Sequence, residues 1–228
     1  MKSKKTAKEK IFDTAVDLFA RKGFNAVGVR EISRSAGVNI SMISYYYGSK
    51  NSLLISIIDH YFDTYHIPLL KKSMISDKPL CEKVTMLIHG LVDIMKEKPA
   101  LAKVAIYELP FEISEIMECK LKKLSKIRSV IMENLFAGMD VDEKNKLKYM
   151  MIVGPALISM TTSYFMLSSV INAVNEKNYC EKHPAHENMR FDDSFFNMYK
   201  ESISELFVNG FDKMWGNLKK KAEEGCGE

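Results

Sequence analysis

Apolar residues recur at helical spacing along most of this 228-residue chain. In the first such segment, over residues 7–22, they fall three or four positions apart and are followed by Gly23, a residue type that commonly ends helices. No run of residues alternates between apolar and polar as a half-buried strand does. The pattern therefore predicts an all-α protein. The positions that establish the first helix are Ile11, Ala15, Leu18 and Phe19.

Two short helices are predicted on either side of Gly37, one over residues 29–36 and one starting near Asn39, which is a suitable N-cap. Glycine can take the positive φ that a tight turn between them needs. Two short helices joined in this way form a helix-turn-helix, whose second helix enters the major groove of DNA. The inner faces are supplied by Val29, Ile32, Ala36, Val38 and Ile43.

A longer helix is predicted over residues 50–67, with Ser49 as its cap and with Pro68 expected to kink or break it. Three further prolines mark later helix boundaries. The last two helices are predicted over residues 142–175 and 193–221, where the helical spacing resumes after polar segments. The boundary prolines are Pro79, Pro99 and Pro110.

The charge distribution separates a basic head from the rest of the chain. Residues 1–50 carry seven Lys and three Arg against four acidic residues, a net charge of +6, whereas the remaining residues have a net charge of −2. A basic patch attracts polyanions and releases their counterions on binding, although a solubilising tail would carry the same charge. We therefore expect two domains, a helix-turn-helix DNA-binding head over residues 1–50 and a larger helical body over residues 51–228.

One segment, residues 149–175, has no formal charge and is long enough to cross a bilayer. Eight Ser, Thr and Asn residues dilute its hydrophobicity, and Gly154 and Pro155 interrupt it. A helix buried by its own domain and by a partner subunit shows the same apolar character. We expect no membrane insertion but a homodimer, in which this helix and the last helix of each subunit form a four-helix bundle. Packing within one subunit would produce the same stripe.

Neither the cysteines nor any motif points to catalysis. The four cysteines are widely spaced without a CxxC pair, and no signal peptide is recognisable, which predicts reduced thiols in a cytoplasmic protein. No nucleophile elbow, phosphate-binding loop, dinucleotide fingerprint or zinc-protease motif is present, so we expect neither an enzyme nor a cofactor. Cys180, His183 and His186 share a polar segment but match no compact zinc pattern, so no metal site is expected.

Three consecutive tyrosines end the second helix of the helix-turn-helix. If Ile43 points to the core, Tyr45 and Tyr46 point outward, and Tyr47 returns toward the core. Exposed tyrosines can donate hydrogen bonds to phosphates or stack on sugars and thymine methyl groups. Lys50, at the start of the next helix, is placed to contact a phosphate.

The stretch "AVGVREISRSAGVNISMISYYYGSKNSL", with "IFDTAVDLFARKGFNAV" before it, resembles the DNA-binding signature of the TetR family of transcriptional regulators. The similarity covers about residues 8–56. It implies a dimeric, ligand-responsive regulator, most simply a repressor, which binds a palindromic operator in double-stranded DNA. It further implies that a small effector bound in the body releases the DNA through the long fourth helix. The implied DNA contacts are Arg30, Asn39, Ile40, Ser41, Ser44, Tyr45, Tyr46 and Lys50.

Several positions depart from the family pattern. Gly28 stands where the family has a capping Thr that also touches a phosphate, and Ser44 replaces the first aromatic residue of the usual pair. Ile40 and Met42 are apolar where polar residues are common. These departures keep an alternative open, namely a helical small-molecule-binding protein with a non-specific or vestigial DNA-binding head.

The resemblance places the effector in the helical body, where aromatic and thioether side chains of central helices are candidates for lining a pocket. The 15 methionines of the chain favour an adaptable apolar cavity and hence a hydrophobic effector. Ordinary core packing produces the same spacing, so we expect about a third of the candidates to contact a ligand. The candidates are Phe62, Tyr65, Met86, Tyr107, Phe111, Met117, Met151, Tyr164 and Phe165.

Overall fold

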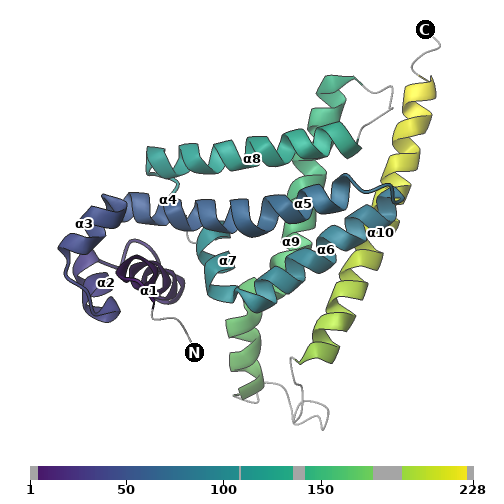
Figure 1. The fold of residues 1–228 in the computed structure, drawn as a ribbon. Coiled ribbons are helices and arrows are strands. Elements are labelled where there is room, and N and C mark those ends of the chain that lie inside the picture. The colour runs from purple at the N-terminus through teal and green to yellow at the C-terminus, as the bar shows by residue number, and fades with distance from the viewer. Residues whose placement is uncertain (1–4, 108, 136–141, 177–191, 225–228) are drawn as a thin grey trace. The chain divides into compact units, whose positions relative to one another are not determined.

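The computed structural model confirms the all-α prediction, because all regular structure in the described residues is helical (Figure 1). The chain divides into two compact units, each made of two segments. The described residues are 5–107, 109–135, 142–176 and 192–224. The first unit is Met1–Pro68 with Glu97–Ile127, and the second is Leu69–Lys96 with Arg128–Glu228.

The first unit begins with three helices, of which the second and third each pack on the first: α1 (Ala7–Lys22), α2 (Val29–Ala36) and α3 (Ser41–Tyr47). A capping box fixes the start of α1, since the Glu9 N–H donates to Thr6 Oγ1 at 3.2 Å and the Thr6 N–H donates to Glu9 Oε2 at 2.8 Å. The helices α2 and α3 confirm the two short helices predicted on either side of Gly37. Their shared core is formed by Ile11, Ala15, Phe19, Ile32 and Ile43.

The next segment corrects the expectation for Pro68. The chain does not break there but stays helical through α4 (Lys50–Tyr61), the π-helical turn η1 (Phe62–His66) and α5 (Ile67–Met74). Proline removes one hydrogen bond and crowds the carbonyl four residues before it, which normally disrupts an α-helix. Here the Ile67 N–H donates to the carbonyl of Phe62, five residues back. The wider π turn directly before the proline accommodates it without ending the helix.

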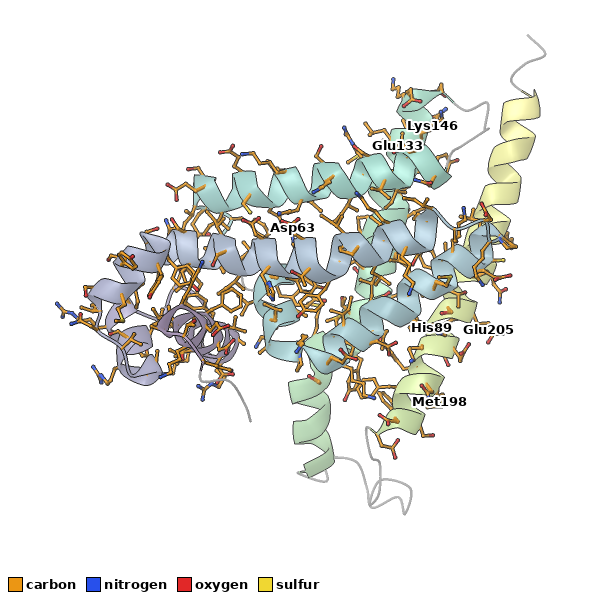
Figure 2. All side chains as sticks on the ribbon, in the orientation of Figure 1. Asp63, His89, Glu133, Lys146, Met198 and Glu205 are labelled. Atoms are coloured by element: carbon orange, nitrogen blue, oxygen red, sulfur yellow. The ribbon has the colours of Figure 1, made fainter. Side chains whose placement is uncertain are left out.

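Helices from later in the sequence complete the first unit. α7 (Pro99–Ile106) packs on α1 and α4, and Lys103 donates to the Ala20 carbonyl at 2.7 Å. Lys123, on α8 (Ser114–Leu135), pairs with Asp59 and Asp63 at 2.7 Å each, and Figure 2 shows Asp63 on the side facing α8. The first compact unit therefore continues past residue 50 to Pro68 and takes in the later segment Glu97–Ile127.

The second unit contains α6 (Leu80–Glu97), α9 (Glu143–Glu176) and α10 (Asp193–Glu224), so the last two predicted helices are confirmed. The helix α9 continues through Pro155. Tyr199 joins α10 to α9, since its hydroxyl donates to the Met160 carbonyl at 2.9 Å. α6 is tied to α10 by the ion pair of Lys200 with Asp93 at 3.0 Å, and His89 faces α10 (Figure 2).

His66, at the end of the π turn, is a buried ionisable residue that the spacing of helices does not predict. Only 6% of its surface is exposed, and Nδ1 has no hydrogen-bond partner among the described residues. Burial, and to a smaller extent the positive charge of Lys120, lowers the pKa of His66 to about 4. The imidazole is therefore neutral at pH 7.

Because His66 is buried in its neutral form, we predict that this residue makes the folded protein less stable in acid. Between the ordinary pKa of 6.5 and about pH 4 the unfolded chain binds a proton at His66 that the folded chain does not, so stability falls as the pH falls. From pH 7 to pH 5 this residue should lower the free energy of unfolding by about 2 kcal/mol. Urea unfolding of His66→Phe should lack that part of the pH dependence, whereas His60→Phe, at an exposed histidine, should retain it. Identical pH dependences for wild type and His66→Phe would contradict the prediction.

Candidate nucleic-acid interface

α3 presents one face to the core and the other to solvent, as the tyrosine pattern predicted. Ile43 is 2% exposed, whereas Tyr45 is 82% exposed, and the rings of Tyr45 and Tyr46 meet edge to face at 4.9 Å. Ile40 and Met42 are also exposed. The outward face therefore combines two phenol groups with two apolar side chains, a surface able to contact both phosphates and thymine methyl groups.

The turn before α3 has the geometry of a helix-turn-helix. Gly37 adopts the left-handed conformation with φ of 64°, so the prediction that this glycine takes a positive φ in the turn is confirmed. Asn39 Oδ1 accepts from both the N–H and the hydroxyl of Ser41 at 2.9 Å each, so Asn39 supplies a side-chain acceptor at the start of α3, although the N-cap position itself is Ile40. Both residues are exposed, as is Ser44. These bonds fix the N-terminal end of α3, which carries most of the implied base contacts.

Tyr47 is structural, as predicted. Its hydroxyl donates to the Lys8 carbonyl at 2.9 Å and thereby ties the end of α3 to α1. Burial raises the pKa of Tyr47 to about 12, and the charge of Asp13 contributes to the same direction. Of the three tyrosines, only Tyr45 and Tyr46 are free to meet DNA.

Lys50 has a structural role that sequence reasoning missed. Its ammonium donates to the carbonyls of Phe24 at 3.1 Å and Val27 at 3.0 Å, and lies 4.0 Å from the centre of the Phe24 ring. Burial lowers the pKa of Lys50. An ammonium has three donors, so one remains for the predicted phosphate contact. These contacts of Lys50 hold α4 against the segment that connects α1 and α2.

Some basic side chains of the head form ion pairs between its helices, whereas others are exposed to solvent. Lys22 on α1 pairs with Glu31 on α2 at 2.6 Å, which braces the two helices. Arg30 and Arg34 are exposed on α2, so the implied contact Arg30 is accessible to DNA. Phosphate contacts from such residues orient a protein on the duplex without reading its sequence.

Gly28 caps α2 without a side chain, as the departure from the family pattern implied. Its φ of −98° and ψ of 157° are allowed for any residue, and nothing lies within 4 Å of the place a Cβ would take. The site therefore has room for the threonine that the family pattern places there. The missing hydroxyl leaves the first N–H groups of α2 without a side-chain acceptor.

The pocket candidates are divided between the two compact units. Phe111 and Met151 are 46% and 73% exposed, which does not suit an enclosed cavity in a single chain. Tyr164 and Phe165 belong to an aromatic cluster with α10. The first unit holds Phe62, Tyr65, Tyr107, Phe111 and Met117, and the second holds Met86, Met151, Tyr164 and Phe165.

Metal ligands do not cluster in the part of the chain that the structure describes, where no group of three or more suitable side chains occurs. Cys180, His183 and His186 lie outside the described residues. Cys81 and Cys119 are free thiols.

Comparison with known proteins agrees with this geometry. Residues 11–57, the span from α1 into α4, match the family of bacterial regulatory proteins, tetR family. The probable helix-turn-helix-type transcriptional regulator YttP of Bacillus subtilis (strain 168) is 28% identical over 205 residues, which cover 88% of this chain and 91% of YttP. The chain belongs to the TetR family of transcriptional regulators.

Two further relatives of this TetR-family chain bear on different parts of it. The transcriptional repressor NicS of Pseudomonas putida is 36% identical over 59 residues, 26% of this chain and 28% of NicS. The crystal structure of the regulator FadR from Bacillus subtilis in complex with stearoyl-CoA covers 89% of this chain and 98% of FadR, with a TM-score of 0.57 and 22% identity. The second similarity extends the family fold over both units. The family consists of regulators rather than enzymes, in agreement with the lack of catalytic motifs.

The open cap at Gly28 leads to a stabilising substitution. Gly28→Thr should raise the free energy of unfolding by about 0.5 kcal/mol through the new cap and the less flexible unfolded chain. It should also tighten DNA binding about threefold to tenfold if the hydroxyl reaches a phosphate. Gly28→Val has the same branching without the hydroxyl, so it should show only the chain-entropy part in urea unfolding and no gain in a DNA titration. Equal effects of Thr and Val would contradict the capping argument.

Proposed function

We propose that this TetR-family regulator is a dimeric repressor that binds a palindromic operator and is released from it by a small hydrophobic effector. The observation that carries the proposal is the exposed face of α3, where Tyr45 and Tyr46 project from a helix fixed by Ile43, Asn39 and Gly37. A recognition helix held this rigidly meets the geometric requirement for entering a major groove. Because it would bind operator DNA, we expect the protein to act in the cytoplasm.

The dimer is supported by the surface of α9. This helix contains Glu143–Ser168, a stretch long and apolar enough to span a bilayer, yet only 17% of its most apolar window is buried within the chain. The chain itself therefore leaves most of this window uncovered. An exposed apolar surface on a soluble regulator marks an interface with another protein. Its exposed apolar side chains are Leu147, Met151, Ile152, Met166 and Leu167.

The hydrophobic effector is supported by the relatives. NicS is named a repressor, and the FadR structure contains stearoyl-CoA, whose long apolar chain is the kind of ligand that a methionine-rich helical body accommodates. An effector releases DNA only if it binds better to a conformation that does not fit the operator.

An alternative function remains, a small-molecule-binding protein whose head no longer binds a specific site. The uncapped start of α2 at Gly28 favours it, because one family contact to phosphate is missing there. The two functions differ in sequence-selective DNA binding.

Selection from a random duplex library should enrich a two-fold symmetric site. Tyr45→Ala should weaken binding to that site at least about tenfold while leaving urea unfolding unchanged, because the side chain is largely exposed. Ile75→Ala, which removes an exposed apolar side chain in the second unit, should bind the site like wild type. Weak, salt-sensitive binding without an enriched site would favour the vestigial head.

A charge on the exposed surface of α9 should separate the subunits. Ile152→Glu places a carboxylate in the proposed interface, so sedimentation should show monomers at concentrations where wild type is dimeric. Binding to the full palindrome should weaken accordingly, because two heads no longer bind as one unit. Lys144→Glu introduces the same residue at an exposed polar position of the same helix and should leave the dimer intact. A dimeric Ile152→Glu protein would place the interface elsewhere.

A further inference from the structure

Three polar side chains lie buried near the junction of α4 and η1 in the first unit, and two of them carry polar atoms without a hydrogen-bond partner among the described residues. Tyr61 is 0% exposed, His66 is 6% exposed and Lys120 is 9% exposed. Tyr61 and His66 belong to consecutive turns at the junction of α4 and η1, and their ring centres are 6.0 Å apart. Lys120 approaches the same junction from α8, with its ammonium 4.4 Å from the centre of the Phe62 ring, which lies 5.2 Å from that of His66.

Lys120 differs from its neighbours on α8 in having no carboxylate partner among the described residues. Lys122 pairs with Glu118 at 2.7 Å, and Lys123 pairs with two aspartates. The ammonium of Lys120 instead donates to the Ala105 carbonyl at 3.2 Å and rests on the Phe62 ring. Burial lowers the pKa of Lys120 to about 8, so it still carries its charge at pH 7. A buried charge without a counter-ion is costly to keep in a folded protein.

The neighbouring polar atoms are also unsatisfied. The Tyr61 hydroxyl and His66 Nδ1 are buried without a hydrogen-bond partner in the described part of the structure. A phenol, an ammonium and a neutral imidazole in the appropriate tautomer can each donate to an anionic oxygen. Phe62 and His66 belong to a π turn, an element that occurs frequently at functional sites.

We propose that Tyr61, His66 and Lys120 form the recognition site for a carboxylate at the end of an amphipathic effector. The inference rests on the proposed function and specifies its ligand: an apolar chain with one small monoanionic group. A single buried ammonium balances a carboxylate, whereas a dianionic phosphate would remain under-compensated in these apolar surroundings. A coenzyme A ester would present only a neutral thioester carbonyl to the same three donors.

Two possible roles of Lys120 in the ligand-free protein predict opposite effects of its replacement on the melting temperature. If it served stability alone, through the Ala105 carbonyl and the Phe62 ring, Lys120→Met should lower the melting temperature. If the charge is retained for a ligand, Lys120→Met removes an uncompensated buried charge and replaces it with an apolar chain, so the melting temperature should rise.

Calorimetric titration of the full-length protein with dodecanoate and with 1-dodecanol, both as monomers in solution, tests the ligand class. Dodecanoate should bind about 10- to 100-fold more tightly than the alcohol, the gain expected from charge-assisted hydrogen bonds. Lys120→Met should abolish this preference while still binding the alcohol, and Tyr61→Phe should reduce it without disturbing the fold. Lys122→Met, at the exposed lysine on the same helix, should keep the full preference.

Release of the selected operator by the same ligands, with dodecanoyl-CoA as a third, separates this inference from the proposed function. Release by the alcohol or the coenzyme A ester, with no carboxylate preference and no effect of Lys120→Met, would overturn the carboxylate site and leave the ligand-responsive repressor standing. A protein that binds the operator but neither binds nor responds to any of the three ligands would overturn the hydrophobic effector as well.

Discussion

The continuous helical segment from Lys50 to Met74 is the element on which the rest of the first unit depends. Near its start, Lys50 fixes the connection between α1 and α2 through two backbone carbonyls. Near its middle, the π turn places Phe62 and His66 against Lys120. The contact with the DNA-binding head and the proposed effector site therefore lie on one helical segment. Coupling between DNA and effector requires an element whose conformation both ligands bias, and this segment meets that requirement. A ligand that drew Lys120 away from the Phe62 ring would change the packing of the helix that supports the head.

The local features of the head could be predicted from sequence because each depends on near neighbours. The turn at Gly37, the side-chain acceptors at Asn39 and Ser49, and the inward side chain of Ile43 follow from φ preferences, hydroxyl or amide acceptors, and helical periodicity. The structural role of Lys50 could not be predicted in the same way. Its partners lie more than twenty residues away in sequence, so only the packing of α1, α2 and α4 reveals them.

Two failures of prediction meet at the π turn. Pro68 was expected to kink or break the helix because local rules assume α-helical hydrogen bonding, yet no break occurs, since the backbone before the proline shifts to bonds over five residues. Lys120 escaped notice although the sequence contains a signal: it stands four positions after Ile116, a fully buried residue of the same helix. A lysine on the buried stripe of a helix requires a partner. Membership of the TetR family does not reveal this, since the family match covers only residues 11–57.

The polar residues of α9 that lie inside the chain are satisfied by the helix itself, since Thr161 and Thr162 are both buried. The hydroxyls of Thr161 and Thr162 donate to the carbonyls of Leu157 and Ile158 at 2.7 Å each, so these groups need no partner outside the helix. Such a helix suits a membrane and a protein interface equally well, because both exclude water. In a regulator whose head must reach DNA, and whose α10 packs against α9 through Tyr199, the second environment fits. In the proposed dimer, the uncharged segment would be the part of each subunit that the partner covers, and that contact would supply the burial that the single chain lacks.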